Sequence, residues 1–127
     1  MTRVLVDSSI WVAHFRNVNR VLHSLLAVDQ VLSHPLIVIE IACSTPPAPR
    51  ERTLGDLKIL QQSVIATTGE ILALIEREQF QDSGCGAVDM ALLASVLLTP
   101  NAVLWTIDKK LDELAERLDV AFDGVIG

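Results

Sequence analysis

The stretch Val4-Leu5-Val6-Asp7-Ser8-Ser9 decides the fold class of this chain. Three consecutive apolar residues of this kind are typical of a strand buried on both faces, as the strands of parallel sheets are. From residue 8 to residue 16 the apolar side chains recur at helical spacing, in Ile10, Trp11 and Phe15. The amino terminus therefore predicts a short buried strand, an acid directly after it, and then a helix.

The same alternation of short apolar strands and helices continues along the chain. Further strands are expected at residues 31–33, 64–66, 103–107 and 120–122, and helices at residues 21–26, 35–44, 50–62, 67–75, 87–98 and 109–118. Such alternation predicts an α/β fold with three layers, α/β/α, around a mostly parallel central sheet of about five strands. No linker or internal repeat interrupts the pattern, so we expect residues 1–127 to form a single domain.

The composition indicates a folded protein rather than a disordered or membrane-spanning one. Half of the 127 residues are apolar, and the mean hydropathy is +0.43. The longest apolar stretches are interrupted by Glu40 and Asp89, and they fall short of the roughly 18 residues that a spanning helix needs. The amino terminus lacks the apolar core of a secretory signal, so we expect a cytoplasmic protein without a membrane contact.

Charge and side-chain types narrow the kinds of site that the chain can build. Sixteen acidic residues face ten basic ones, giving a net charge of −6, which is unpromising for bulk attraction to phosphate. Few aromatic side chains are available for stacking on bases. Cys43 and Cys85 form no CxxC pair and the three histidines are scattered, so a zinc site is not expected. A role on nucleic acid therefore requires that several acids be neutralised by metal.

Two acids follow predicted strands at the edge where α/β folds bind ligands, beyond the carboxyl ends of the strands. Asp7 follows the first strand and Asp108 follows the strand at residues 103–107. Each of them, taken alone, fits a helix N-cap equally well. Asp89 lies in the first turn of a predicted helix, where the helix dipole favours a negative charge. Structural stabilisation explains Asp89 better than function does when this residue is considered by itself.

Glu40 has no such structural explanation. It lies within Leu36-Ile37-Val38-Ile39-Glu40-Ile41-Ala42, apolar on every side. A buried unpaired carboxylate is costly, so such groups are usually protonated, paired or bound to metal. If Glu40 and the three aspartates converge, they repel one another unless a hard divalent cation such as Mg²⁺ or Mn²⁺ joins them. Ions of this type activate water and stabilise charge on a phosphodiester.

The chain resembles the PIN-domain ribonucleases, and among them the VapC-type toxins of toxin–antitoxin pairs. The matching pieces occur in the family's order and run over nearly the whole chain. They are Val4-Leu5-Val6-Asp7-Ser8-Ser9, the helix that bears Glu40, Gly86-Ala87-Val88-Asp89-Met90-Ala91-Leu92-Leu93-Ala94-Ser95, and Leu104-Trp105-Thr106-Ile107-Asp108-Lys109.

The resemblance implies a site and a set of partners. The catalytic and metal-binding quartet would be Asp7, Glu40, Asp89 and Asp108, with Ser8, Thr106 and Asp112 in supporting positions. It further implies metal-dependent cleavage of RNA with Mg²⁺ or Mn²⁺, a small protein antitoxin that blocks the active site, and a homodimer. Apart from the resemblance, the chain has few residues suited to holding RNA; the candidates are Arg16, Arg20, Arg50, Arg52, Lys109 and Lys110, and a solvated surface charge explains each of them better when it is considered alone. The region of residues 45–52, which holds three prolines, is where the match is weakest.

Two other functions stay open from the residues alone. A metal-dependent phosphatase or phospho-acceptor domain also places an acid like Asp7 after its first strand. The haloacid-dehalogenase-like pattern needs a second Asp where this chain has Ser9, and neither pattern explains Glu40 or Asp89. A catalytically silent binding module with the same fold is the second alternative, although all four acids are present.

Overall fold

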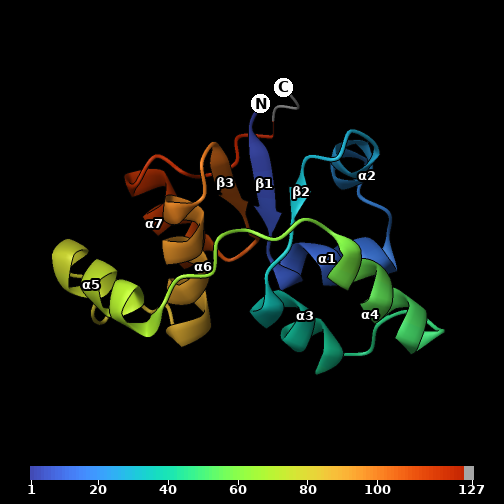
Figure 1. Cartoon of the computed structure of the whole chain (residues 1–127), viewed down its shortest axis with the longest axis horizontal. Coiled ribbons are helices and arrows are strands. Elements are labelled where there is room, and N and C mark those ends of the chain that lie inside the picture. Colours follow the sequence, from blue (N-terminus) through green and yellow to red (C-terminus); the bar gives the residue numbers. More distant parts are fainter. Residues whose placement is uncertain (125–127) are drawn as a thin grey trace.

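The computed structural model describes residues 1–124 and contains a small parallel sheet surrounded by helices (Figure 1). The strands and helices follow one another in the order β1 (Arg3–Val6), α1 (Ser8–Arg16), α2 (Arg20–Ala27), β2 (Val31–Leu32), α3 (Pro35–Ala42), α4 (Arg50–Ile59), α5 (Thr68–Glu78), α6 (Ala87–Leu98), β3 (Ala102–Trp105) and α7 (Lys109–Arg117). The α/β class and the parallel sheet expected from the sequence are confirmed. In the described part of the chain, no helix has the length and apolar character needed to cross a membrane.

The sheet has β1 at its centre, with β2 and β3 on its two sides and all strands parallel. Val4 pairs with Val31 of β2 and with Val103 of β3. Val4, Leu5 and Val6 are all buried. Because successive strand residues point to opposite faces of a sheet, this continuous burial means that both faces of β1 are covered. All carboxyl ends of the strands point to one edge, where α1, α3 and α6 also lie (Figure 1).

The prediction of about five strands was wrong, because three strands form within residues 1–124. Of the two other expected segments, residues 120–122 make an isolated bridge and residues 64–66 make none. At residues 64–66 the backbone N–H groups donate to side chains, one in α6 and one at Thr99 directly after it, and not to another strand. Val64 N donates to Thr99 Oγ1 at 2.9 Å and Ala66 N donates to Ser95 Oγ at 3.1 Å. The bridge to this part of the chain forms two residues earlier, between Ser33 and Gln62.

The other missing strand, at residues 120–122, is reduced to one rung beside β3. Leu104 N donates to Val120 O at 2.7 Å, and Phe122 N donates to Leu104 O at 2.9 Å. These bonds form the isolated bridge between Leu104 and Ala121. A chain that leaves the sheet edge after one rung keeps parallel pairing but is too short to count as a strand.

Helix α6 runs through the middle of the helical layer and is the most buried helix. Every residue from Met90 to Val96 is buried, which agrees with the apolar run that the sequence shows there. Its neighbour α5 begins at a capping box, in which Thr67 Oγ1 accepts from Glu70 N and Glu70 Oε1 accepts from Thr67 N, as the Thr-x-x-Glu spacing predicts. The amino-terminal end of α6, which carries Asp89, lies at the carboxyl edge of the sheet (Figure 1).

Candidate active site

The four predicted acids come from four elements that meet at the carboxyl edge of the sheet (Figure 1). Asp7 lies between β1 and α1, and Asp108 lies at the start of α7, after β3. Glu40 belongs to α3 and Asp89 to the first turn of α6. The parallel sheet brings the first two together, since neighbouring parallel strands end at the same edge.

Asp7 is held in one orientation by hydrogen bonds to both of its oxygens. Its Oδ1 accepts from Ser8 N at 2.8 Å, while Oδ2 accepts from Ser9 Oγ at 2.9 Å and from Thr106 Oγ1 at 2.8 Å. The side chain is buried. The expected N-cap role and the expected place at the ligand edge are therefore compatible, because this carboxylate occupies both positions.

Ser8 connects Asp7 to Glu40. Its hydroxyl donates to Glu40 Oε1 at 2.9 Å and also lies 3.5 Å from Asp7 Oδ1. Glu40 is partly exposed rather than fully buried, and its neighbour Ile39 is 55 % exposed, so the helix is less enclosed than its apolar sequence suggests. Burial raises the pKa of Glu40, and the negative charges of Asp7 and Asp89 add to this effect, whereas the hydrogen bond from Ser8 opposes it.

Asp89 sits at the amino-terminal end of α6 and is about as enclosed as Glu40. Gly86 N donates to its Oδ2 at 3.4 Å, a long bond at the position that the dipole argument favours. Burial raises the pKa of Asp89, the bond from Gly86 opposes the shift, and the charges of Asp7 and Asp108 reinforce it. The carboxylate is thus both a helix-end group and a member of an acidic cluster.

Asp108 caps α7 from an exposed position. Its Oδ1 accepts from Lys110 N at 2.9 Å and from Leu111 N at 3.2 Å, and its own backbone N donates to Thr106 Oγ1 at 3.1 Å. Thr106 therefore bridges the two strand-end acids, since it donates to Asp7 and accepts from Asp108. This bridging explains why the threonine hydroxyl matters at that position.

The charge couplings join all four acids into one cluster. Glu40 is affected by Asp7 and Asp89, and Asp89 is affected by Asp7 and Asp108. Within residues 1–124, however, no three acidic, histidine or cysteine side chains are arranged as a ready-made metal site. Like charges without a cation between them repel, and here Asp7 and Asp108 direct oxygens toward hydroxyl and backbone donors instead.

The donor set nevertheless fits a hard divalent cation. In the described part of the chain, Glu40 Oε2, Asp89 Oδ1 and Asp108 Oδ2 accept no hydrogen bond from the protein. Carboxylate oxygens are the ligands that Mg²⁺ and Mn²⁺ prefer. Three of the acids therefore each keep one oxygen available, and the fourth, Asp7, is fixed beside them.

The supporting residues divide into two groups. Ser8 and Thr106 contact the acids directly, as expected, whereas the Asp112 side chain forms no hydrogen bond or ion pair with residues 1–124, and its role stays a prediction. Sequence reasoning missed Ser9, which donates to Asp7 and accepts from Ile107 N at 3.3 Å. The signal was available, since a second hydroxyl directly follows Asp7-Ser8 at the start of a helix.

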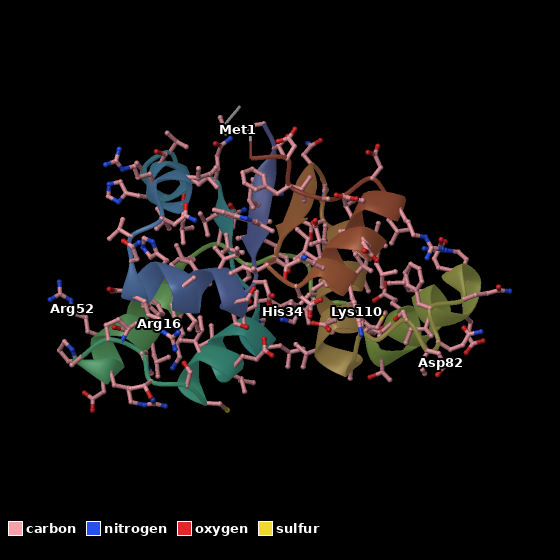
Figure 2. All side chains as sticks on the ribbon, turned by 180° about the vertical axis from the view of Figure 1, so that it is seen from behind. Met1, Arg16, His34, Arg52, Asp82 and Lys110 are labelled. Carbon is pink, nitrogen blue, oxygen red and sulfur yellow. The ribbon has the colours of Figure 1, made fainter. Side chains whose placement is uncertain are left out.

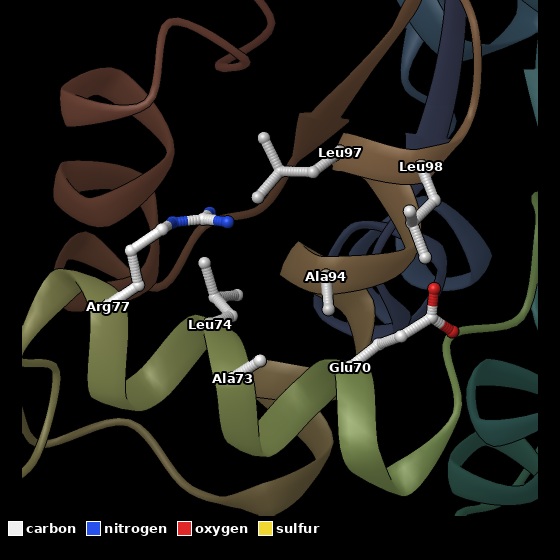
Figure 3. A pocket seen from close by; sticks show the side chains of 7 residues that line it. All are labelled: Glu70, Ala73, Leu74, Arg77, Ala94, Leu97 and Leu98. Carbon is white, nitrogen blue, oxygen red and sulfur yellow. The ribbon is translucent and has the colours of Figure 1, made fainter.

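Three pockets of the described chain are lined by residues other than the four acids. One, of about 230 Å³, lies between α5 and α6 and is lined by Glu70, Ala73, Leu74, Arg77, Ala94, Leu97 and Leu98 (Figure 3). Another, of about 250 Å³, is formed by Trp11, Phe15, Leu26, Thr53, Asp56, Leu57 and Leu60. A third and larger pocket, of about 410 Å³, is lined by Val12, Phe15, Arg16, Ser44, Thr45 and Pro47, so none of the three pockets is lined by one of the four acids.

Comparison with known proteins gives the family. No family model matches the chain. Over 118 residues it is 38 % identical to Ribonuclease VapC32 of Mycobacterium tuberculosis, in both strain CDC 1551 / Oshkosh and strain ATCC 25618 / H37Rv. The match covers 93 % of this chain and 94 % of the relative.

The chain belongs to the VapC-type PIN ribonucleases. The alignment spans the VapC relative from nearly end to end. Membership of the VapC family favours a nuclease over a phosphatase or phospho-acceptor function for Asp7.

Proposed function

We propose that this protein is a metal-dependent endoribonuclease that acts as the toxin of a toxin–antitoxin pair. The observation that carries the proposal is the gathering of four acids from four elements at one edge of the sheet, where Ser8 connects Asp7 to Glu40 and Thr106 connects Asp7 to Asp108. The similarity to a ribonuclease of the VapC family supports a role for this cluster in RNA cleavage. Mg²⁺ or Mn²⁺ is the proposed cofactor.

The acids Asp7, Glu40, Asp89 and Asp108 would hold the metal, which supplies activation of water and neutralisation of phosphodiester charge. The chain's own hydroxyls prepare the acids for this task. Ser9 and Thr106 fix Asp7 Oδ2, and Ser8 orients Glu40 Oε1. Rigidly held ligands matter because a misplaced ligand lowers both affinity and rate.

The proposed partners are an RNA substrate, a small protein antitoxin that covers the active site, and a second copy of the chain. These follow from the family to which the chain belongs, and the cytoplasm is the proposed location. The exposed and partly apolar pockets between helices offer surfaces for protein contacts. Of these partners, RNA is the one that the four acids themselves support, because a metal ion held by carboxylates acts on phosphodiesters.

The test is incubation of the purified chain with total RNA in Mg²⁺ or Mn²⁺, with an Asp7→Asn variant and a chelator as controls. We expect cleavage by the wild type only, with products that carry 5′-phosphate and 3′-hydroxyl ends, because metal-activated water is the nucleophile. Full activity in chelator, or products with 2′,3′-cyclic phosphates, contradicts the metal mechanism. Absence of any cleavage favours the silent binding module instead.

A further inference from the structure

Lys110 is a basic residue that lies beside the acidic cluster. Its backbone N donates to Asp108 Oδ1 at 2.9 Å, and its side chain is exposed at the start of α7. Figure 2 shows Lys110 at the carboxyl edge of the sheet, while Arg16 and Arg52 lie on the other side of the molecule. Of these three candidates for holding RNA, only Lys110 is therefore beside the acids.

The path of the lysine side chain depends on Gly84. This glycine has a φ of +89°, and a Cβ added to it would lie 2.7 Å from Lys110 Cδ and 2.9 Å from Lys110 Nζ. A side chain at position 84 would thus collide with the lysine along its outer half. The loop before α6 offers a bare backbone surface on which the extended side chain of Lys110 lies.

The ammonium group of Lys110 lies against Gly84, in the loop that leads to the helix of Asp89, and forms no ion pair within residues 1–124. Burial raises the pKa of the neighbouring Cys85 thiol, Asp89 and Asp108 add to that shift, and the positive charge of Lys110 opposes it. All three charges therefore act on the same thiol. Within residues 1–124 the one ion pair joins Arg77 and Glu78, so Lys110 is not neutralised by a carboxylate contact.

Helix stability does not account for this lysine. A positive charge in the first turn of a helix opposes the helix dipole and weakens the helix slightly. An exposed, unpaired ammonium beside a phosphodiester-cleaving site instead has an evident use, since ammonium groups bind phosphate oxygens as compact charges. Such a contact reads the RNA backbone and not its bases.

We infer that Lys110, guided by Gly84, binds a backbone phosphate of single-stranded RNA at the rim of the acidic cluster. The inference rests on the proposed ribonuclease function and adds a substrate-binding residue to it. The phosphate contact offsets the repulsion between RNA and an acidic protein at the place where cleavage occurs. It is a charge contact, so arginine should replace lysine there and glutamine should not.

The binding test uses a fluorescein-labelled pool of random single-stranded RNA and the Asp7→Asn protein in Mg²⁺, with binding followed by anisotropy. Adding Lys110→Gln should weaken binding by about tenfold at low salt, as expected for one charge-assisted contact. The slope of log affinity against log KCl should become shallower by about 0.7, the value for one phosphate contact on a single strand. Lys58→Gln, which removes the same charge from an exposed position on α4, is the matched control and should leave the slope unchanged.

Gly84→Ala tests the guiding role separately. The added methyl displaces the lysine side chain but leaves its charge, so this variant should lose part of the RNA affinity that Lys110→Gln loses. In the Lys110→Gln background it should cause no further loss. Gly124→Ala is the control for backbone strain, because Gly124 has a φ of +86° and an added Cβ meets nothing within 4 Å. It should bind RNA like the parent protein.

The outcomes separate this inference from the proposed function. Wild type that cleaves total RNA while Lys110→Gln keeps the parental salt slope overturns the role of Lys110 alone. The role of Lys110 is also overturned if Lys110→Arg is as weak as Lys110→Gln, or if Lys58→Gln changes the slope equally. Wild type that cleaves no RNA, together with an Asp7→Asn protein that binds none, overturns both.

Discussion

Thr106 Oγ1 donates a hydrogen bond of 2.8 Å to Asp7 Oδ2, across 99 positions of sequence. The same hydroxyl accepts from Asp108 N at 3.1 Å. It thereby ties together the ends of two neighbouring strands, each of which carries an acid of the candidate active site. The threonine is buried, with 8 % of its surface exposed, so water does not readily replace either bond.

Replacing Thr106 by valine should lower both stability and metal affinity. Valine keeps the shape but removes one of the two donors to Asp7 Oδ2 and the acceptor of the Asp108 N–H, which costs about 1 to 3 kcal/mol. Thr106→Ser keeps the hydroxyl and should stay close to wild type in metal affinity. Chemical denaturation and Mn²⁺ titration measure the two effects, and equal metal affinities for the valine and serine variants would contradict the orienting role.

Substitutions of Asp108 should separate its role as the N-cap of α7 from the effect of its negative charge on stability. Asn retains an oxygen that accepts from Lys110 N and Leu111 N, whereas Ala does not. Without metal, Asp108→Ala should therefore lose about 1 kcal/mol of unfolding free energy. Asp108→Asn should lose less than the alanine variant, because it keeps the cap while removing a repulsive charge from the cluster. Thermal or urea unfolding in chelator distinguishes these values, and equal losses would show that the cap contributes nothing.

His34 should make stability depend on pH. Its Nδ1 accepts from Leu36 N at 3.1 Å and its Nε2 lies 3.2 Å from Ser95 Oγ, an arrangement that requires the neutral ring. Burial lowers the pKa of His34, so below about 6.5, the ordinary value, the unfolded chain binds more protons than the folded one. The stability that this neutral ring contributes is complete above that pH and is lost as the pH falls.

The pH effect is measured by comparing wild type with His34→Asn in urea unfolding between about pH 5 and about pH 7.5, a range set by the ordinary histidine pKa. Asparagine retains an acceptor for Leu36 N but does not titrate. The variant should be less stable at neutral pH, and its stability should fall less steeply as the pH is lowered. Glu40 and Asp89, whose pKa values are raised, are common to both proteins, so they cancel in the difference. Parallel pH profiles would assign the dependence to other groups.

The sequence predicted best what depends on neighbouring residues. The run Val4-Leu5-Val6 and the acid that follows it predicted β1 and the position of Asp7, and the capping-box spacing predicted the start of α5. Residues 64–66 were assigned to a strand because they are apolar. Their backbone donors instead find Thr99 and Ser95, a partnership between segments 29 and 35 residues apart that local pattern does not encode.

The candidate active site shows the same division. That Asp7 and Asp108 would meet followed from parallel strands ending at one edge. The orientation of each carboxylate did not follow, because it depends on which hydroxyl or backbone donor lies within reach after folding. Ser9 was overlooked for this reason, since its contact with Asp7 is a matter of side-chain geometry.

In living cells, expression of the chain without its partner should slow growth, and Asp7→Asn or Asp89→Asn should relieve the effect. The reason is the proposed cleavage of cellular RNA, which needs an intact acidic cluster. Equal soluble levels of the three proteins must be shown by immunoblot. If wild type and both variants are equally harmless, the toxin role is wrong, while the nuclease role is judged by the RNA assay alone.

Metal binding should stabilise the wild type far more than it stabilises the charge-neutralised variants. A ligand at about a hundredfold excess over its dissociation constant adds about 2.7 kcal/mol to the folded state. The melting temperature of wild type should therefore rise with Mn²⁺, and that of Asp89→Asn should rise much less. Without metal, Asp89→Asn should melt no lower than wild type, because the variant removes repulsion from Glu40 and Asp7 and loses only the long bond from Gly86.

Glu113→Gln is the matched control for this metal experiment. Glu113 is exposed on α7, and its neutralisation changes the net charge by the same amount without touching the cluster. Its response to Mn²⁺ should equal that of wild type. If Asp89→Asn melts well below wild type and all three proteins respond equally to Mn²⁺, the acid serves the start of α6 and the ion binds elsewhere. A selective loss of the Mn²⁺ response in Asp89→Asn instead assigns the ion to the edge of the sheet where the four acids gather.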